Sequence, residues 1–281
     1  MAVEQRRARW GWLAVAVAVT AIVCLPFYWA ISLSVRNPSE AFTVSGLGVP
    51  FLQYRPTLAN WQTELATGET QKALINSLVV ALCTAVVVVA VGAPAAYAIA
   101  RFRFRRPSNG DITLWFLSQR VLPPVATAIP LFLMIRFLGL YDTRTGLVLL
   151  NVTFCLPLVV VIMRQAFLDL PFELEEAALV DGAGHAHIFL RICLPLAAPS
   201  LVAAVLIVIA FTWNEFLLAL MIGTLNAKMI SVHMAGAADT RGVQFWFVAV
   251  RTLIAMTPPV ILALLAQRYI VRGLTFGAVK G

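Results

Sequence analysis

Six long apolar stretches dominate the sequence and restrict what the chain can fold into. Each is about long enough to cross the ~30 Å hydrocarbon core of a bilayer as a helix that rises about 1.5 Å per residue. Only 12% of the 281 residues are charged, against about 25% in a typical soluble domain. We therefore expect an all-α, polytopic membrane protein with six transmembrane helices. The spans are expected at about 12–35, 73–100, 112–138, 145–162, 196–222 and 246–270.

The distribution of basic residues predicts how these spans are oriented. With the N-terminus in the cytoplasm, twelve of the 21 Lys and Arg residues fall on the cytoplasmic side, six fall outside and three lie within spans. Cytoplasmic loops of membrane proteins are enriched in these residues, so both termini are expected there. The predicted segments are a cytoplasmic N-terminus at 1–11, one transmembrane domain at 12–270 that includes a cytoplasmic loop at 164–195, and a cytoplasmic tail at 271–281.

Prolines are expected to interrupt two of the spans. Pro123, Pro124 and Pro130 fall in the third span, and Pro258 and Pro259 fall in the sixth. Each proline removes a helix N–H donor and clashes with the preceding turn, which frees backbone carbonyls. Lipid tolerates such carbonyls only where they face protein or a water-filled cavity. The prolines therefore indicate either packing kinks or a lined pathway.

Motifs of several function classes are missing from the sequence. There is no GxxxxGK[ST] phosphate loop, no HExxH, no nucleophile elbow and no pair of intramembrane carboxylates. The four cysteines lie in or beside apolar runs without metal-ligand spacing, so we interpret them as reduced, buried packing residues. Cytoplasmic flanks that face anionic lipid explain the net charge of +8 without a nucleic-acid partner. We expect no enzyme, no catalytic residue, no metal site and no cofactor bound by the chain itself.

The segment at 170–184, in the cytoplasmic loop, has the signals of a short amphipathic helix. A proline suits the first helical turn, acidic side chains complement the positive end of the helix dipole, and a glycine can end the helix in a left-handed conformation. Apolar residues at i, i+3 and i+4 spacing share one face. A second short helix is expected from about 185 to 194. The residues that carry the first set of signals are Pro171, the acids Glu173, Glu175 and Glu176, the glycines Gly182 or Gly184, and the apolar residues Leu174, Ala177 and Ala178.

This loop resembles the cytoplasmic EAA loop of permeases in binding-protein-dependent ABC importers. In the loop, the resemblance is carried by Glu176-Ala177-Ala178, Asp181-Gly182-Ala183, Phe189, Ile192, Leu194-Pro195 and Pro199. Other segments look like the carbohydrate-uptake branch of that family, the permeases of the maltose and glycerol-3-phosphate type. These segments are Asn76-Ser77, Ala96-Tyr97-Ala98, Leu122-Pro123-Pro124, Trp213-Asn214-Glu215-Phe216 and the tail at 271–281.

The resemblance implies one permease subunit of an importer in the cell membrane of a bacterium or archaeon. Such a subunit forms half of the path that moves a sugar or sugar-like solute into the cytoplasm by alternating access. The implied partners are a homologous second permease, two ATPase subunits that bind ATP and Mg²⁺, an extracytoplasmic solute-binding protein and the lipid bilayer. The residues expected to couple to the ATPase are Glu175, Glu176, Ala177, Ala178, Asp181, Gly182 and Ala183. The tail residues expected to reach the ATPase are Gly277, Lys280 and Gly281.

Polar residues within the spans are candidates for solute contact, because they are costly in lipid and usually functional. They are Trp213, Asn214, Glu215, Arg251 and Arg120. An indole face beside an amide and a carboxylate suits a sugar, which offers C–H faces and hydroxyl groups together. A structural alternative stays open, in which Glu215 pairs with Arg251 of the antiparallel sixth span and Trp213 only anchors its helix at the membrane interface.

An ion-coupled secondary transporter is the alternative function. It would also use broken helices, but it needs intramembrane acidic residues to carry the ion. Glu215 is the only carboxylate well inside a predicted span. The sequence therefore favours the importer.

Overall fold

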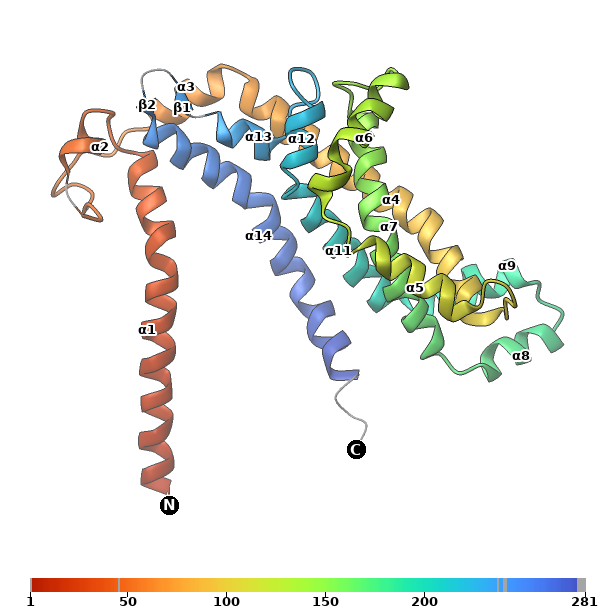
Figure 1. Ribbon diagram of the computed structural model, residues 1–281. Helices are drawn as coiled ribbons and strands as arrows, with labels where there is room; N and C mark the ends of the chain where they lie inside the picture. The colour runs from red at the N-terminus through yellow and green to blue at the C-terminus, as the bar shows by residue number, and fades with distance from the viewer. Residues whose placement is uncertain (1, 45, 237, 240–241, 277–281) are drawn as a thin grey trace. The chain divides into compact units, whose positions relative to one another are not determined.

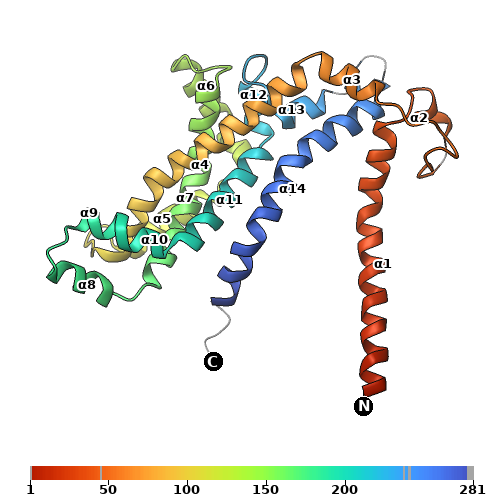
Figure 2. The same cartoon turned by 180° about the vertical axis from the view of Figure 1, so that it is seen from behind.

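The computed structural model describes residues 2–44, 46–236, 238–239 and 242–276, and the side chains of 10–44, 46–236 and 243–265. Within these residues the fold is helical, as predicted, with one two-residue antiparallel ladder (Figures 1 and 2). The elements are α1 (Ala2–Ser34), α2 (Glu40–Thr43), α3 (Ala59–Ala66), α4 (Glu69–Arg101), α5 (Asn109–Gln119), α6 (Pro124–Phe137), α7 (Arg144–Leu168), α8 (Glu173–Val180), α9 (His185–Ile188), the π-helix η1 (Phe189–Cys193), α10 (Leu194–Leu196), α11 (Ala198–Trp213), α12 (Leu217–Ile222), α13 (Ile230–Ala235), β1 (Ala238–Asp239), β2 (Gly242–Val243) and α14 (Phe245–Phe276).

Membrane-spanning helices account for most of this fold. In the described part of the chain, four helices are long and apolar enough to cross a membrane, and two bent helix pairs raise the number to six if each pair is one span. One pair turns by 90° between α5 and α6, and the other turns by 77° between His185–Leu196 and α11. The predicted all-α, multi-pass fold is confirmed. The four single spans are Trp10–Ser34, Glu69–Arg101, Arg144–Leu168 and Phe245–Leu265.

The third, fifth and sixth predicted spans differ in how they are broken. The third breaks before Pro124, as the proline argument predicts, because Pro123 is extended and Pro124 opens α6. The fifth, expected as one helix over 196–222, ends α11 at Trp213 and resumes as α12 at Leu217. The expected interruption of the sixth span is wrong, because α14 continues through Pro258 and Pro259.

Local sequence signals explain where several helices begin. Ser108 caps α5 with a reciprocal capping box, in which its side chain accepts from the Asp111 N–H and the Asp111 side chain accepts from the Ser108 N–H. Thr143 caps α7 by accepting a hydrogen bond from the N–H of Gly146 at 3.1 Å. These caps satisfy N–H groups that have no partner inside a helix. They fix the starts of two helices that pack on each other.

The chain divides into two compact units, residues 1–71 with 234–256 and residues 72–233 with 257–281. In the larger unit, α4, α7 and α11 lie side by side and share one apolar core, on which α5 also packs (Figures 1 and 2). A second core joins α12 to α6 and α7. Lipid is as apolar as these side chains, so close packing and polar contacts hold such helices together. Helices α8 and α9 lie at one end of this unit, and the loops after α6 and α12 lie at the other.

In the smaller unit, a buried arginine holds the loop that follows α1. Arg36 is 1% exposed. Its guanidinium donates to Ser32 Oγ at 2.9 Å and to the Leu47 carbonyl at 2.5 Å, and it lies over the ring of Tyr54. A Cβ at position 48 would collide with this guanidinium, and Gly48 has a φ of +70°, so a side chain there would be strained and would displace Arg36. These contacts fix the course of the chain between α1 and α3.

Candidate functional site

Helix α8 and the turn after it form an exposed projection at one end of the larger unit (Figure 1). The turn is a Schellman motif, in which the N–H of Gly182 donates to the Leu179 carbonyl at 3.0 Å and the N–H of Ala183 donates to the Ala178 carbonyl at 2.9 Å. This motif places the residue after the helix in the left-handed region, and Gly182 has a φ of +84°. The predicted glycine stop is confirmed at Gly182.

The seven residues predicted to couple to an ATPase point in different directions. Glu176, Ala177, Asp181 and Gly182 are exposed, and Ala178 and Ala183 are half-buried. Four of the seven border a hollow of about 530 Å³, which is lined by Ala178, Asp181, Gly182, Ala183, Gly184, His187 and Ile192. Most of the predicted set therefore forms one accessible surface.

Glu175 is the exception, because it is only 5% exposed. Its carboxylate faces the end of α4 and accepts hydrogen bonds from Tyr97 and Arg101. The expected apolar face also differs from the face that packs, since Leu174 is 44% exposed and Ala177 is exposed. Helix α8 thus packs on the bundle through Glu175 and Ala178.

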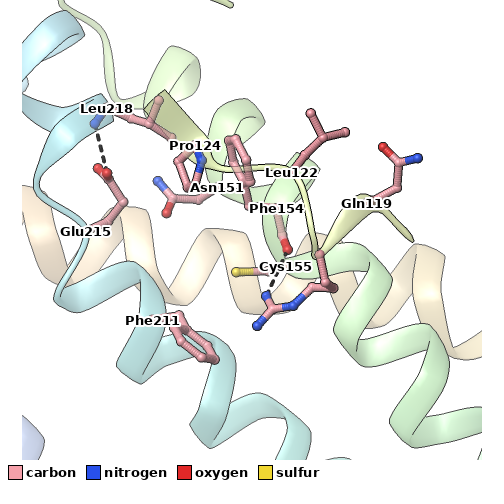
Figure 3. Close-up of a pocket in the computed structure, with 10 residues that line it drawn as sticks. Gln119, Leu122, Pro124, Asn151, Phe154, Cys155, Phe211, Glu215 and Leu218 are labelled. Atoms are coloured by element: carbon pink, nitrogen blue, oxygen red, sulfur yellow. Dashed lines mark hydrogen bonds between the residues drawn. The ribbon is translucent and has the colours of Figure 1, made fainter. Parts of the chain in front are cut away.

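A second candidate site is a pocket of about 260 Å³ where the third and fifth spans break (Figure 3). Aromatic rings, amides, one guanidinium and one carboxylate contribute to its wall. The lining residues are Gln119, Arg120, Leu122, Pro124, Asn151, Phe154, Cys155, Phe211, Glu215 and Leu218. The pocket therefore brings together two of the predicted pathway residues, Arg120 and Glu215, which are 95 positions apart in the sequence.

Glu215 stabilises the break in the fifth span. Its carboxylate accepts a hydrogen bond from the N–H group of Leu218 at 2.8 Å (Figure 3) and another from the N–H group of Ala219 at 2.8 Å. These N–H groups lie in the first turn of α12, where a helix has no internal acceptor for them. Ser231 Oγ donates to the Glu215 carbonyl at 2.6 Å. The local acceptor explains why the span breaks here without a proline.

Arg120 places a cation at the pocket wall. Its Nη1 donates to the Phe154 carbonyl at 3.4 Å, and its guanidinium carbon lies 5.2 Å from the centre of the Phe211 ring. Both partners are uncharged, so the positive charge of Arg120 is not neutralised by either of them.

The other predicted pathway residues lie elsewhere. Trp213 is 4% exposed, which does not fit an anchor at the lipid interface, and neither Trp213 nor Asn214 lines the pocket. Arg251 lies in the smaller unit, where its Nε donates to Glu64 Oε1 at 2.6 Å and its Nη2 donates to Oε2 at 3.2 Å. The Glu215–Arg251 ion pair, which the sequence left open, stays a hypothesis; the contacts of the structure give Arg251 the Glu64 carboxylate and give Glu215 the N–H groups of α12.

Sequence reasoning missed Glu64 as the partner of Arg251. Glu64 is 3% exposed but lies on the short helix α3, outside every predicted span. A cation within a span, such as Arg251, needs a counter-charge. That need was the one signal in the sequence that could have directed the search to acidic residues outside the spans. Asn151 and Gln119 were also missed, because no local pattern shows that their side chains reach the pocket.

At the opposite end of the larger unit from α8, Asp142 joins the loop after α6 to the loop after α12. Its carboxylate accepts hydrogen bonds from the backbone N–H groups of Thr224 at 3.0 Å, Leu225 at 3.1 Å, Asn226 at 2.9 Å and Ala227 at 3.1 Å. Burial alone would raise the pKa of this carboxyl, but the four N–H donors outweigh it and lower the pKa below its usual value.

Asn76, at the same end of α4, holds the same loop. Its Nδ2 donates to the carbonyls of Asn226 and Lys228, both at 2.9 Å, and its Oδ1 accepts from Arg144 Nε at 2.8 Å. The adjacent Ser77 Oγ accepts from the N–H of Ile230 at 2.8 Å. The Asn76-Ser77 pair thus fastens α4 to the loop after α12.

Broken spans around a pocket with apolar and polar lining, and a short exposed helix at one end, fit a membrane-embedded transport subunit. The chain belongs to the family described as the inner membrane component of binding-protein-dependent transport systems, whose profile matches residues 89–276. It is therefore a permease of the ABC importer type and a component of a transporter. The importer prediction is confirmed over the ion-coupled alternative.

Relatives and solved structures agree with this assignment. The chain is 36% identical to the trehalose transport system permease protein SugB of Mycobacterium tuberculosis, over 98% of this chain and 99% of the relative. It is 35% identical to the trehalose/maltose transport system permease protein MalG of Thermococcus litoralis, over 96% of each chain. A chain of a bacterial ABC transporter that imports the acidic polysaccharide alginate has the same fold, with a TM-score of 0.78 at 21% identity over 94% of this chain and 96% of that chain.

Proposed function

We propose that this permease forms half of a pathway that carries a sugar or sugar-like solute into the cytoplasm. The relatives named for trehalose and maltose transport support this solute class. The observation that carries the proposal is the pocket at the two broken spans, because it combines aromatic rings with hydrogen-bonding groups, and a sugar has both C–H faces and hydroxyls. Phe154 and Phe211 offer ring faces for C–H groups, and Arg120, Asn151 and Gln119 offer polar groups for hydroxyls.

Among the predicted pathway residues, Arg120 and Glu215 are the ones we assign to this pathway. Glu215 shapes the pocket by capping α12, and Arg120 donates to oxygen atoms of the solute. Asn214 is exposed beside the break and is a further contact candidate. Trp213 and Arg251 take packing and ion-pairing roles in this proposal.

Two partner ATPase subunits bind ATP and Mg²⁺, and one of them docks on the exposed side of α8, around Glu176, Ala177, Asp181 and Gly182. This chain binds neither ATP nor Mg²⁺, which accords with a sequence that has no phosphate loop. ATP binding moves α8, the spans tilt, and the pocket opens to one side of the membrane and then to the other. A homologous second permease supplies the other half of the pathway, and an extracytoplasmic binding protein delivers the solute.

The end of the molecule that carries α8 faces the cytoplasm in this proposal, together with both chain termini. The excess of Arg and Lys in the segments on that side supports this orientation. The predicted tail contact with the ATPase, by Gly277, Lys280 and Gly281, lies outside the described residues and stays a prediction.

Affinity purification of the tagged chain from its native membranes in mild detergent tests the assembly. We expect mass spectrometry to identify an ATPase, a second permease of this family and the solute-binding protein, whose thermal stability can then be screened against a panel of sugars. Recovery of the chain alone, folded and active in uptake driven by an ion gradient, would overturn the proposal.

A matched pair of variants tests the pocket. Phe211→Ala removes a ring from the pocket wall, whereas Phe137→Ala removes a ring that is 91% exposed on α6. We expect only Phe211→Ala to lower solute uptake by the assembled importer, with no change in how the binding protein binds the sugar. Equal uptake by both variants would argue against the pocket as the solute site.

A further inference from the structure

Glu175 differs from its neighbours on α8 because its carboxylate is buried and accepts two hydrogen bonds. Oε2 accepts from the Tyr97 hydroxyl at 2.7 Å, and Oε1 accepts from Arg101 Nε at 2.5 Å. The side chains of Arg101 and Glu175 are 8% and 6% exposed. A buried carboxylate is costly unless it is paired and hydrogen-bonded, and here both oxygens have a partner.

The two partners of Glu175 lie on one face of a single helix. Tyr97 and Arg101 are four residues apart at the end of α4, a spacing that places side chains one above the other. Because the Glu175 carboxylate accepts one hydrogen bond from Tyr97 and one from Arg101, it cannot turn without breaking one of the two. The two bonds therefore connect α8 to α4 at a fixed orientation.

Arg101 adds contacts with the chain that leads into α8. Its Nη2 donates to the Leu170 carbonyl at 3.1 Å, and its guanidinium carbon lies 5.7 Å from the centre of the Phe172 ring. The beginning of α8 and its buried side are thus attached to the same arginine. Apart from Glu175 and Ala178, the described residues of α8 are exposed, so this polar connection is a large share of what holds the helix.

Aromatic packing fixes the position of Tyr97. Its ring centre lies 5.5 Å from that of Phe167 on α7 and 5.1 Å from that of Phe189 at the start of η1. Tyr97 is 5% exposed, so it is buried beneath the surface that a docked subunit would touch. Its hydroxyl is therefore held toward Glu175 by the bundle itself.

We propose that Glu175 is a positioning residue that transmits the movement of α8 to α4 through Tyr97 and Arg101, without touching the ATPase. This inference rests on the proposed function, because it assumes that an ATPase moves α8. Helix α4 is 33 residues long, and its other end holds the loop after α12 through Asn76 and Ser77. A displacement of α8 thus acts directly on a helix that reaches the opposite end of the unit.

Three variants test the connection. Tyr97→Phe removes one hydroxyl and keeps the ring, and Glu175→Gln removes the charge with little change in shape. Glu173→Gln is the matched control, because Glu173 is an exposed acid in the first turn of the same helix. Hydrogen exchange of the α8 amides is measured in the full chain in nanodiscs without partners, and transport per ATP hydrolysed is measured in the assembled importer.

We expect Tyr97→Phe and Glu175→Gln to raise amide exchange in α8 by about tenfold, the factor for one buried hydrogen bond of ~1.4 kcal/mol. We also expect transport per ATP to fall while ATP hydrolysis continues, because the ATPase subunits still hydrolyse ATP but the movement of α8 no longer reaches α4. A merely unstable protein would lose both activities together. Glu173→Gln should change neither quantity.

Two results would overturn the inference. Wild-type exchange and wild-type transport per ATP in Tyr97→Phe would show that the hydroxyl does not connect the helices. Loss of ATPase association in Glu175→Gln with unchanged α8 exchange would show that Glu175 contacts the ATPase directly. If the wild-type chain recruits no ATPase, the proposed function fails, whereas the exchange measurement on the isolated chain still decides whether the connection exists.

Discussion

Replacing Asp142 by asparagine should loosen the loop at 223–229 while keeping the shape of the side chain. The substitution turns one carboxylate oxygen into an NH₂ group, which cannot accept the two hydrogen bonds that Asn226 donates to Oδ2. It also removes the charge that strengthens the remaining bonds. Asp142 has a φ of +53°, a conformation that asparagine tolerates, so backbone strain does not add to the effect.

The magnitude follows from the lost bonds. A hydrogen bond to a charged group contributes about 1.5–3 kcal/mol, so amide exchange in the loop should rise by about 10- to 150-fold at neutral pH. Asp169→Asn, at the end of α7, is the matched control, because within the described part of the chain the Asp169 carboxylate accepts a side-chain bond from Gln165, four residues earlier, and none from a distant loop. Wild-type exchange in the Asp142→Asn loop would refute the argument.

The same carboxylate predicts a dependence on pH. Its pKa is lower in the folded state than in the unfolded chain, so its contribution to stability is complete above the unfolded value of about 3.9. That contribution is lost as the pH falls through the folded value. The thermal unfolding midpoint of the wild type in detergent should therefore fall more steeply below about pH 4 than that of Asp142→Asn. Parallel curves would count against this account.

Three further substitutions follow from the other contacts. Glu64→Ala leaves the half-buried guanidinium of Arg251 without this counter-charge, so unfolding should become easier by up to about 3 kcal/mol, the lower end of the cost of breaking a buried pair. An unchanged thermal midpoint would contradict the pairing. Gly182→Ala forces a residue with a Cβ into the left-handed region at φ +84°, which costs about 1–2 kcal/mol. Amide exchange at the end of α8 should therefore increase, and unchanged protection of these amides would argue against the strain. Arg120→Gln removes the cation from the pocket and should lower solute uptake by about tenfold, the factor for one charge-assisted hydrogen bond. Association with the ATPase should be retained, and normal uptake would exclude a solute contact at this residue.

The sequence predicts the single spans well because their signal is local. Apolar runs such as 73–100 and 145–162 correspond to the continuous helices α4 and α7, since helix formation in lipid depends on length and hydropathy. The break before Pro124 was predictable for the same reason, because a proline acts on its own helix. Gly182 also ends α8 by a local requirement for positive φ.

The features that escaped prediction depend on contacts that no simple sequence pattern marks. The fifth span breaks where Glu215 caps α12, and neither a proline nor a glycine marks that point. The Glu215–Arg251 hypothesis assumed one continuous helix and compared depths by residue count, so it missed Glu64 on α3. Similarly, the burial of Glu175 depends on Arg101, 74 residues earlier, and hydrophobic periodicity cannot show that an acid faces inward.

Helix α14 shows the opposite error. Pro258 and Pro259 predicted an interruption, yet the helix continues through both. A proline in a membrane helix removes hydrogen bonds without forcing the axis to end, because neighbouring groups can satisfy the freed carbonyls. Proline therefore marks where a span can break, and the surrounding contacts decide whether it does.

Uptake into proteoliposomes that contain the purified importer tests the central claim most directly. Labelled sugar, identified with the co-purified binding protein, is supplied with that protein on the outside, and ATP with Mg²⁺ or an ion gradient is provided in separate preparations. The account predicts uptake that requires ATP, the ATPase and the binding protein, and that is insensitive to the ion gradient. Uptake by this chain under an ion gradient without ATP or the ATPase would contradict it.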